Sequence, residues 1–153
     1  MVGEAVEANK VMMRCWVEEG VNQGQLAAYD AVFADTILSH SRQQTVQRTV
    51  DELKQNNVTV RAAFPDRRRT IEDIIAEGDR VVLRFTDRGT HPGEYAGFAP
   101  TGKPMTLTGI LIWRISGGKV VEQWLEEDML GVMQQFGAEL RPPAASPNRS
   151  CSP

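Results

Sequence analysis

Cysteine and histidine are scarce in this chain, and their scarcity excludes several kinds of site. Among 153 residues there are two cysteines, Cys15 and Cys151, and two histidines, His40 and His91. No C-x-x-C pair and no Cys/His cluster occurs, so the sequence suggests neither a zinc site nor a disulfide framework. We therefore expect no bound metal, and we expect Cys15 to be a small core residue.

Long apolar runs and clustered positive charge are also missing. No apolar stretch approaches the ~20 residues of a membrane-spanning helix, and no basic-then-apolar signal segment is evident. The formal net charge of −3 argues against a nucleic-acid surface, which needs clustered lysine and arginine. We interpret the one basic run, Arg67-Arg68-Arg69, as a solvated strand face or a row of salt bridges rather than a phosphate site. The expectation is a cytoplasmic protein without nucleic-acid or membrane partners.

What the sequence does contain is a change of hydrophobic period from 3.6 to 2. Helical spacing occurs in the segments 4–19, 25–33 and 45–56, the last with Thr45 as the expected cap. Strand-like segments are 36–41, 69–76, 80–90, 103–116 and 119–127. Helices segregated from a meander of strands predict an α+β domain. We expect a curved antiparallel sheet wrapped around the N-terminal helices as a cone-shaped barrel, whose open mouth is a small-molecule site.

This domain is expected to span residues 1–140. The segment 141–153 is rich in proline and serine and cannot bury enough apolar area to fold, so we predict a disordered tail there.

The last predicted strand passes directly into a short helix that ends at Gly137. On the strand, Glu122, Trp124, Glu126 and Asp128 share parity and can point to one face. At the junction an aspartate is favoured as a helix N-cap. The alternative is a general base in an apolar pocket beside Trp124, and the two roles are compatible because a cap holds a carboxylate firmly.

Three sequence blocks carry a resemblance to a known family. They are Gly89-Thr-His-Pro-Gly-Glu-Tyr95, Gly97-Phe-Ala-Pro-Thr-Gly-Lys103, and Gly118-Lys-Val-Val-Glu-Gln-Trp124 with Asp128 and Gln134-Gln-Phe-Gly137 behind it. In order and spacing, residues 4–138 resemble the SnoaL-like polyketide cyclase (predicted ester cyclase) family, within the superfamily built like nuclear transport factor two. Two positions depart from the family pattern, because Gln123 stands where histidine is more usual and Phe136 where leucine is.

The resemblance implies an α+β barrel with a deep apolar pocket, assembled as a homodimer or homotetramer. It also implies an intramolecular aldol ring closure on an apolar, polyketide-like substrate, without metal or cofactor, and an acid/base aspartate that matches Asp128. His91 is the second catalytic candidate, as a hydrogen-bond donor to an enolate; its alternative is a structural histidine in the loop. The candidate substrate contacts are Trp124, His40, Tyr29, Trp16, Glu122, Phe85 and Trp113, each of which has a core, packing or surface role as its alternative.

Two other functions stay open on this scaffold. An epoxide hydrolase or a ketosteroid-isomerase-like enzyme is one; the hydrolase needs an Asp–Arg–Asp group around a water. Arg84, Arg88 or Arg114 could offer the arginine, but only one inward aspartate is evident. A non-catalytic binding or dimerisation module is the other, favoured by a sealed or very small cavity.

Overall fold

The chain folds as helices packed into the hollow of one long curled sheet. The computed structural model describes residues 1–91 and 93–145. The helices are α1 (Val2–Cys15), its continuation as the π-helix η1 (Trp16–Asn22), α2 (Ala27–Val32), α3 (Val50–Ala63) and α4 (Met129–Gln135). The strands are β1 (Phe33–Ser41), β2 (Gln44–Thr49), β3 (Arg68–Glu77), β4 (Arg80–Thr90), β5 (Pro104–Ser116) and β6 (Lys119–Glu127).

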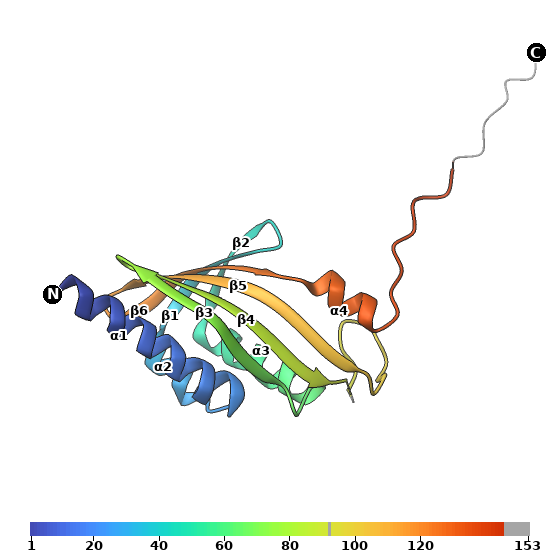
Figure 1. The fold of residues 1–153 in the computed structure, drawn as a ribbon, viewed down its shortest axis with the longest axis horizontal. Helices are drawn as coiled ribbons and strands as arrows, with labels where there is room; N and C mark the ends of the chain where they lie inside the picture. Colours follow the sequence, from blue (N-terminus) through green and yellow to red (C-terminus); the bar gives the residue numbers. More distant parts are fainter. Residues whose placement is uncertain (92, 146–153) are drawn as a thin grey trace, which may run out of the picture.

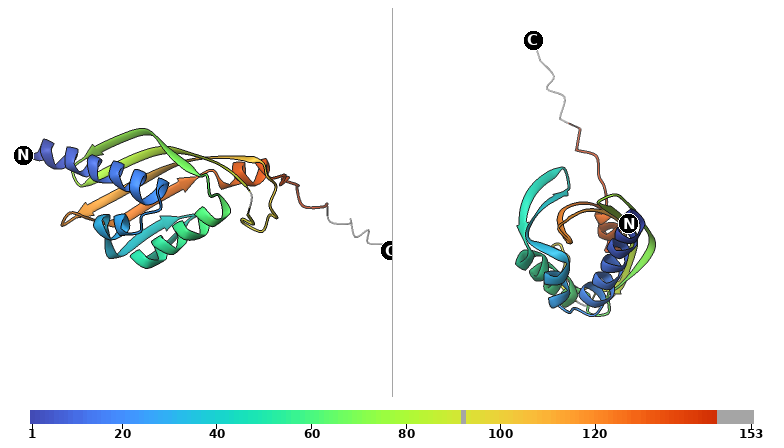
Figure 2. Two further views of the ribbon diagram at one scale, coloured as in Figure 1. Left: turned by 90° about the horizontal axis from the view of Figure 1, so that it is seen from below. Right: turned by 90° about the vertical axis from the view of Figure 1, so that its left-hand side faces the viewer.

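The six strands form one mixed sheet in the order β2-β1-β6-β5-β4-β3. All neighbouring strands are antiparallel except β1 and β6, which run parallel. The helices α1, α2 and α3 lie along the open side of the curled sheet (Figure 1). Seen end-on, the sheet and these helices close into a ring (Figure 2). The predicted α+β architecture with a curved sheet around N-terminal helices is confirmed. The expectation of a wholly antiparallel sheet is wrong at one place, where β1 pairs in parallel with β6.

The boundaries of α3 differ from the prediction for 45–56. Thr45 lies in β2, and the helix begins after Thr49. The Glu52 amide donates to Thr49 Oγ1 at 3.2 Å and the Thr49 amide donates to Glu52 Oε2 at 2.7 Å, a capping box that fixes the start. Thr45 and Val46 are β-branched and suit the strand. The prediction that Asn56-Asn57 ends this helix is also wrong, since it runs on to Ala63.

The core consists of two clusters. The larger joins the inner face of β4 and β5 to η1 and α2, with Leu83 and Trp113 fully buried. The smaller lies near α4, around Phe64 and Phe136. The prediction that Cys15 is a core residue is wrong, because it is exposed at the end of α1.

Residues 141–145 form no helix or strand, and the rest of the predicted tail, 146–153, lies outside the described residues. Within the described part of the chain, no helix is both long enough and apolar enough to cross a membrane.

Candidate functional site

A cavity of about 200 Å³ lies between the inner face of the sheet and the helices. Its wall is largely apolar and includes Val21, Phe33, Leu53, Leu107, Leu111 and Leu125. Two exposed residues of the lining, Arg42 and Asn56, mark its open side. Concave apolar sites with a few convergent polar groups are typical of small-molecule binding.

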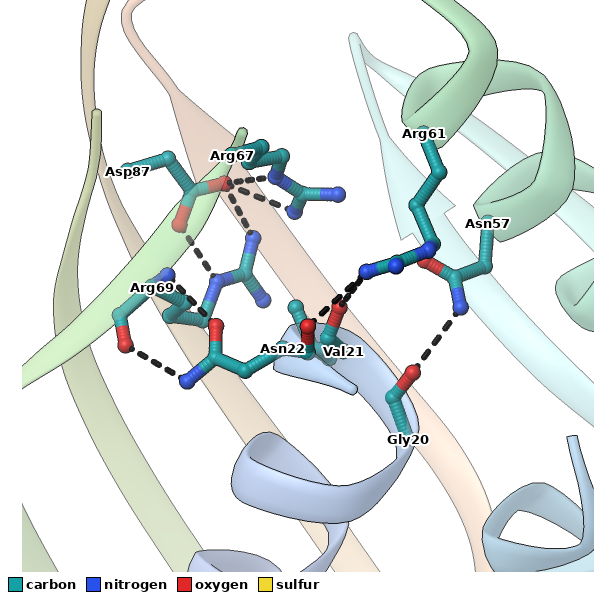
Figure 3. A network of polar contacts seen from close by, with 8 residues as sticks. All are labelled: Gly20, Val21, Asn22, Asn57, Arg61, Arg67, Arg69 and Asp87. Carbon is teal, nitrogen blue, oxygen red and sulfur yellow. Dashed lines mark hydrogen bonds and ion pairs between the residues drawn. The ribbon is translucent and has the colours of Figure 1, made fainter. Parts of the chain in front are cut away.

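The polar part of this wall is built around Asp87, which is completely buried on the inner face of β4. Arg69 binds it in a two-pronged geometry, with Nε donating to Oδ1 at 2.7 Å and Nη2 to Oδ2 at 2.9 Å. Arg67 donates to Oδ2 through Nε at 2.9 Å, and its Nη2 lies 2.7 Å from the same oxygen as an ion pair. Figure 3 shows both guanidinium groups converging on the one carboxylate. The interpretation of the basic run as a solvated face is therefore wrong for these two arginines, although the salt-bridge interpretation is right.

Neighbouring residues hold Arg69 in place from two sides. Its guanidinium carbon lies 3.7 Å from the centre of the Phe85 ring, and Phe85 in turn lies over Gly109 of β5, where an added Cβ would come within 2.5 Å of that ring. The backbone of Arg69 is bracketed by the side-chain amide of Asn22, which accepts from its N–H at 2.7 Å and donates to its carbonyl at 3.1 Å. The π-helical end of α1 thus positions a residue of the site, as π-helical turns often do.

The same π-helical segment is anchored on its other side by α3. Asn57 donates to the Gly20 carbonyl at 2.9 Å, and Arg61 donates to the Asn22 carbonyl at 2.8 Å (Figure 3). Asn57 is buried and lines the cavity. One of the side chains that fix the helical half of the barrel, Asn57, therefore also forms part of the cavity wall.

Burial and the attraction between opposite charges shift the pKa values of Asp87 and Arg67 in opposite directions. Burial raises the pKa of Asp87, but Arg69 and Arg67 together outweigh it and hold that pKa below its ordinary value. Burial lowers the pKa of Arg67, and the adjacent Arg69 lowers it further against the attraction of Asp87. Burial also raises the pKa of Tyr29, another residue of the wall, to about 12, so its phenol stays neutral.

Glu127 is the second carboxyl group of the cavity. It lies at the end of β6, opposite Gly109 in the register. Its side chain is 21% exposed and its Oε1 lies 3.8 Å from Nη2 of Arg42, which is 72% exposed at the open side. Burial raises the pKa of Glu127 above its usual value, with a smaller contribution from Asp87, and the surrounding arginines offset part of this rise. A carboxyl whose pKa lies nearer neutrality is suited to exchanging protons with a substrate.

The expectation that Asp128 faces the cavity is wrong. Its side chain is exposed and accepts a hydrogen bond from the Gly131 amide at 2.8 Å, as the N-cap of α4. It lies beside a shallow depression on the outside of the sheet. The predicted common parity of Glu122, Trp124 and Glu126 is right, but the face they share is the outer one.

Trp124, His40 and Glu122 accordingly gather on the outer face, away from the cavity. The rings of His40 and Trp124 stack at 5.0 Å, and His40 Nε2 lies 2.8 Å from Glu122 Oε1. Arg114 donates to the other carboxylate oxygen of Glu122 at 2.8 Å. None of the three lines the cavity, so the expectation that they lie on its wall is wrong.

His91 is completely buried but does not line the cavity. Its ring stacks on Phe136 at 4.0 Å, and its Nδ1 lies 3.0 Å from Thr101 Oγ1. Its backbone N–H donates to the Lys103 carbonyl, and its carbonyl accepts from the Gly102 amide. These contacts match the structural alternative, a histidine that holds the loop, and it does not converge with Asp128.

Of the remaining predicted contacts, Trp16 and Tyr29 line the cavity. Phe85 lies beneath Arg69, and Trp113 is fully buried behind Trp16 with the rings edge-on at 5.5 Å. The charged cavity residues that sequence reasoning missed are Asp87, Arg67, Arg69 and Glu127. A signal for Asp87 existed, because it shares parity with the apolar residues of β4.

Comparison with known proteins agrees with this geometry. The family model described as SnoaL-like polyketide cyclase matches residues 8–136. A crystal structure of a candidate polyketide cyclase from Acidithiobacillus ferrooxidans superposes with a TM-score of 0.74 at 29% identity, covering 84% of this chain and 93% of that one. AclR, a candidate hydroxylase from Streptomyces galilaeus, superposes with a TM-score of 0.77 at 28% identity, covering 86% of this chain and 97% of that one. IdmH, a candidate polyketide cyclase from Streptomyces antibioticus, superposes with a TM-score of 0.73 at 27% identity, covering 85% of this chain and 99% of that one.

No curated protein matches the chain significantly. The chain shares its curled α+β fold with these solved structures. The chain belongs to the SnoaL-like polyketide cyclase family.

Proposed function

We propose that this protein is a cofactor-independent cyclase that closes a ring in a polyketide-like carbonyl compound by an intramolecular aldol reaction, with Glu127 rather than Asp128 as its acid/base. The observation that supports this most directly is the position of Glu127. It is a mostly buried carboxyl group with a raised pKa, facing a cavity whose wall is largely apolar outside the cluster around Asp87.

In the proposed reaction, the Glu127 carboxylate removes a proton from a carbon between two carbonyl groups. The resulting enolate attacks a second carbonyl carbon of the same molecule, which forms the new carbon–carbon bond and leaves an alkoxide. Glu127 then returns its proton to the alkoxide oxygen. Arg67 lies in the same cavity and can stabilise the negative charge on the enolate oxygen, a role for which preorganised donors are effective.

The apolar wall supplies the second requirement, which is a folded substrate. Correct orientation of two reacting groups can contribute ~7–11 kcal/mol to lowering a barrier. A cavity of ~150 Å³ can hold a benzene-sized molecule, so about 200 Å³ suits the ring that is being closed. We propose that the remainder of the substrate extends past Arg42 at the open side. The expected homodimer or homotetramer stays a prediction.

The test compares neighbouring carboxylates on opposite faces of β6. With a linear substrate that carries a β-ketoester and a distant ketone, Glu127→Gln should lower kcat on the order of 10²–10⁴-fold, the usual contribution of a positioned acid/base. The kcat of Glu126→Gln, a change on the outer face, should stay within about twofold of the wild-type value, since surface changes away from a site have small effects. An unchanged kcat in Glu127→Gln would exclude this assignment.

A second function has one specific observation in its favour. Two carboxyl groups share the cavity, and their pKa values are shifted in opposite directions, down for Asp87 and up for Glu127, which is the pattern of a base and an acid working together. The positively charged Arg69 lines the same cavity as these two carboxyl groups. The three side chains together resemble the carboxylate–arginine–carboxylate group expected of an epoxide hydrolase. Arg84, Arg88 and Arg114, the arginines first considered for that role, do not line the cavity. Diol formation from an aryl epoxide, lost in Glu127→Gln, would favour this alternative.

A further inference from the structure

The cavity carries positive charge in a protein that is negative overall. Three guanidinium groups line it, from Arg42, Arg67 and Arg69, against the two carboxyl groups of Asp87 and Glu127. The chain as a whole has a formal charge of −3. Even with both acids ionised, one positive charge is in excess, and protonation of Glu127 increases that excess. A neutral polyketide ester would leave this charge without a partner.

The excess can be located at Arg67. Asp87 is the one carboxylate shared by both buried arginines, and Arg69 engages each of its oxygens. Arg67 reaches only Oδ2, which already accepts from Arg69. Figure 3 shows the outer terminal nitrogen of Arg67 turned away from Asp87, without a bond to any residue drawn there.

The low exposure of the Arg67 side chain makes its unused hydrogen-bond donors costly unless a ligand binds them. A guanidinium group has five N–H donors in a fixed planar fork, and a buried charge is costly unless it is paired and hydrogen-bonded. The side chain of Arg67 is 11% exposed, and that of Arg69 7%. Arg69 binds both oxygens of Asp87 and lies over the Phe85 ring, whereas Arg67 contacts one oxygen and keeps a terminal nitrogen free for a ligand in the cavity that it lines. A planar anion in the cavity would complete the fork of Arg67.

We propose that the substrate carries an ionised carboxylate and that Arg67 binds it within the cavity. A carboxylate matches the planar fork of arginine, and a single negative charge matches the single excess positive charge. A dianionic phosphate would instead place extra negative charge near Asp87 and Glu127. This inference rests on the proposed function in taking the cavity as the substrate site, but the binding itself requires no turnover.

The experiment compares a matched pair of ligands, 2-naphthoate and 2-naphthamide, which share shape and differ in charge. Dissociation constants are measured by calorimetry on the full chain. Wild type should bind the carboxylate at least about tenfold more tightly, and Arg67→Gln should remove that preference while leaving amide binding within about threefold. Arg84→Gln, on the outer face, should keep the preference. Glu127→Gln should bind naphthoate at least as tightly as wild type, because it removes a nearby negative charge.

Equal binding of the two ligands by wild type would overturn the proposal without any variant, so the result does not depend on whether Arg67→Gln folds. A preference that persists in folded Arg67→Gln would equally overturn the assignment to Arg67. Failure of the cyclase proposal gives a different result, namely retained turnover in Glu127→Gln, and it leaves the charge preference intact.

Discussion

The two faces of β6 have similar compositions and very different surroundings. Glu127 faces the cavity, while Glu126 and Asp128, its immediate neighbours, face outward. Burial alters the acidity of Glu127, whereas Asp128 caps a helix in contact with water. A strand alternates between faces at every residue, so one position decides whether a carboxylate faces substrate or solvent.

The same contrast exists for ion pairs on β3 and β4. Asp87 and Asp73 each accept a guanidinium nitrogen at 2.7 Å, from Arg69 and Arg84 respectively. The inner carboxylate is completely buried, while both side chains of the outer pair are more than half exposed. Asp87 also binds two arginines where Asp73 binds one, so differences in their energetic effect report on burial and on the number of partners together.

The largest difference is expected from neutralising the inner carboxylate. Asp87→Asn leaves two buried guanidinium groups without their counter-charge, and breaking a buried pair in this way costs ~3–5 kcal/mol. Asp73→Asn removes an exposed pair, for which the cost is ~0–1 kcal/mol. Urea unfolding of both variants measures the two free energies.

Equal losses in the two variants would show that the Asp87 cluster is open to water in solution. The pH dependence gives an independent check. The pKa of Asp87 is lowered by folding, so its stabilisation is present above the unfolded value of about 3.8 and is lost as the pH falls through the lower, folded value. This acid-dependent loss should be absent from Asp87→Asn.

A smaller effect is expected at the outer end of β6. Asp128→Ala removes the N-cap of α4, which typically costs ~0.5–2 kcal/mol, and should leave kcat within about threefold. Asp128→Asn should lose less stability, because asparagine also caps well. Thermal unfolding and the cyclisation assay together check this. A large loss of kcat in Asp128→Asn with an unchanged Tm would restore Asp128 as the base.

The sequence was sufficient for the family, the α+β architecture and five of the six strands, because these follow from periodicity and from motifs spread over most of the chain. The site was harder, since parity groups residues on a face without saying which face is inner. Trp124 suggested an inner face by its size, yet its ring is covered outside by His40 and by the guanidinium of Arg80, 4.8 Å away. On β6 the inward residues include Gln123 and Glu127, so polarity did not mark the cavity side.

The Arg67–Asp87 cluster was beyond sequence reasoning for a different reason. Arg67 and Arg69 lie twenty and eighteen residues from Asp87 along the chain, and only the pairing of β3 with β4 brings them together. A run of three arginines normally indicates a solvated surface. Here Arg68 is exposed and Arg69 is buried, as strand alternation requires, and the side chain of Arg67, just before β3, is only 11% exposed.

The smallest expected effect is a pH-dependent gain in stability. Because the pKa of Glu127 is raised by folding, the folded state binds its proton more tightly than the unfolded state does. Above the folded pKa the group is ionised in both states and its burial opposes folding; this penalty disappears as the pH falls through the folded pKa towards the ordinary value of 4.5. Glu127→Gln should therefore raise Tm slightly at pH 7, and the gain should vanish near pH 4. Glu126→Gln, fully on the outer face, should show no such pH-dependent difference. If Tm depends on pH in the same way in both variants, Glu127 is solvated in solution. The two faces of β6 then do not differ in the pKa of their carboxyl groups.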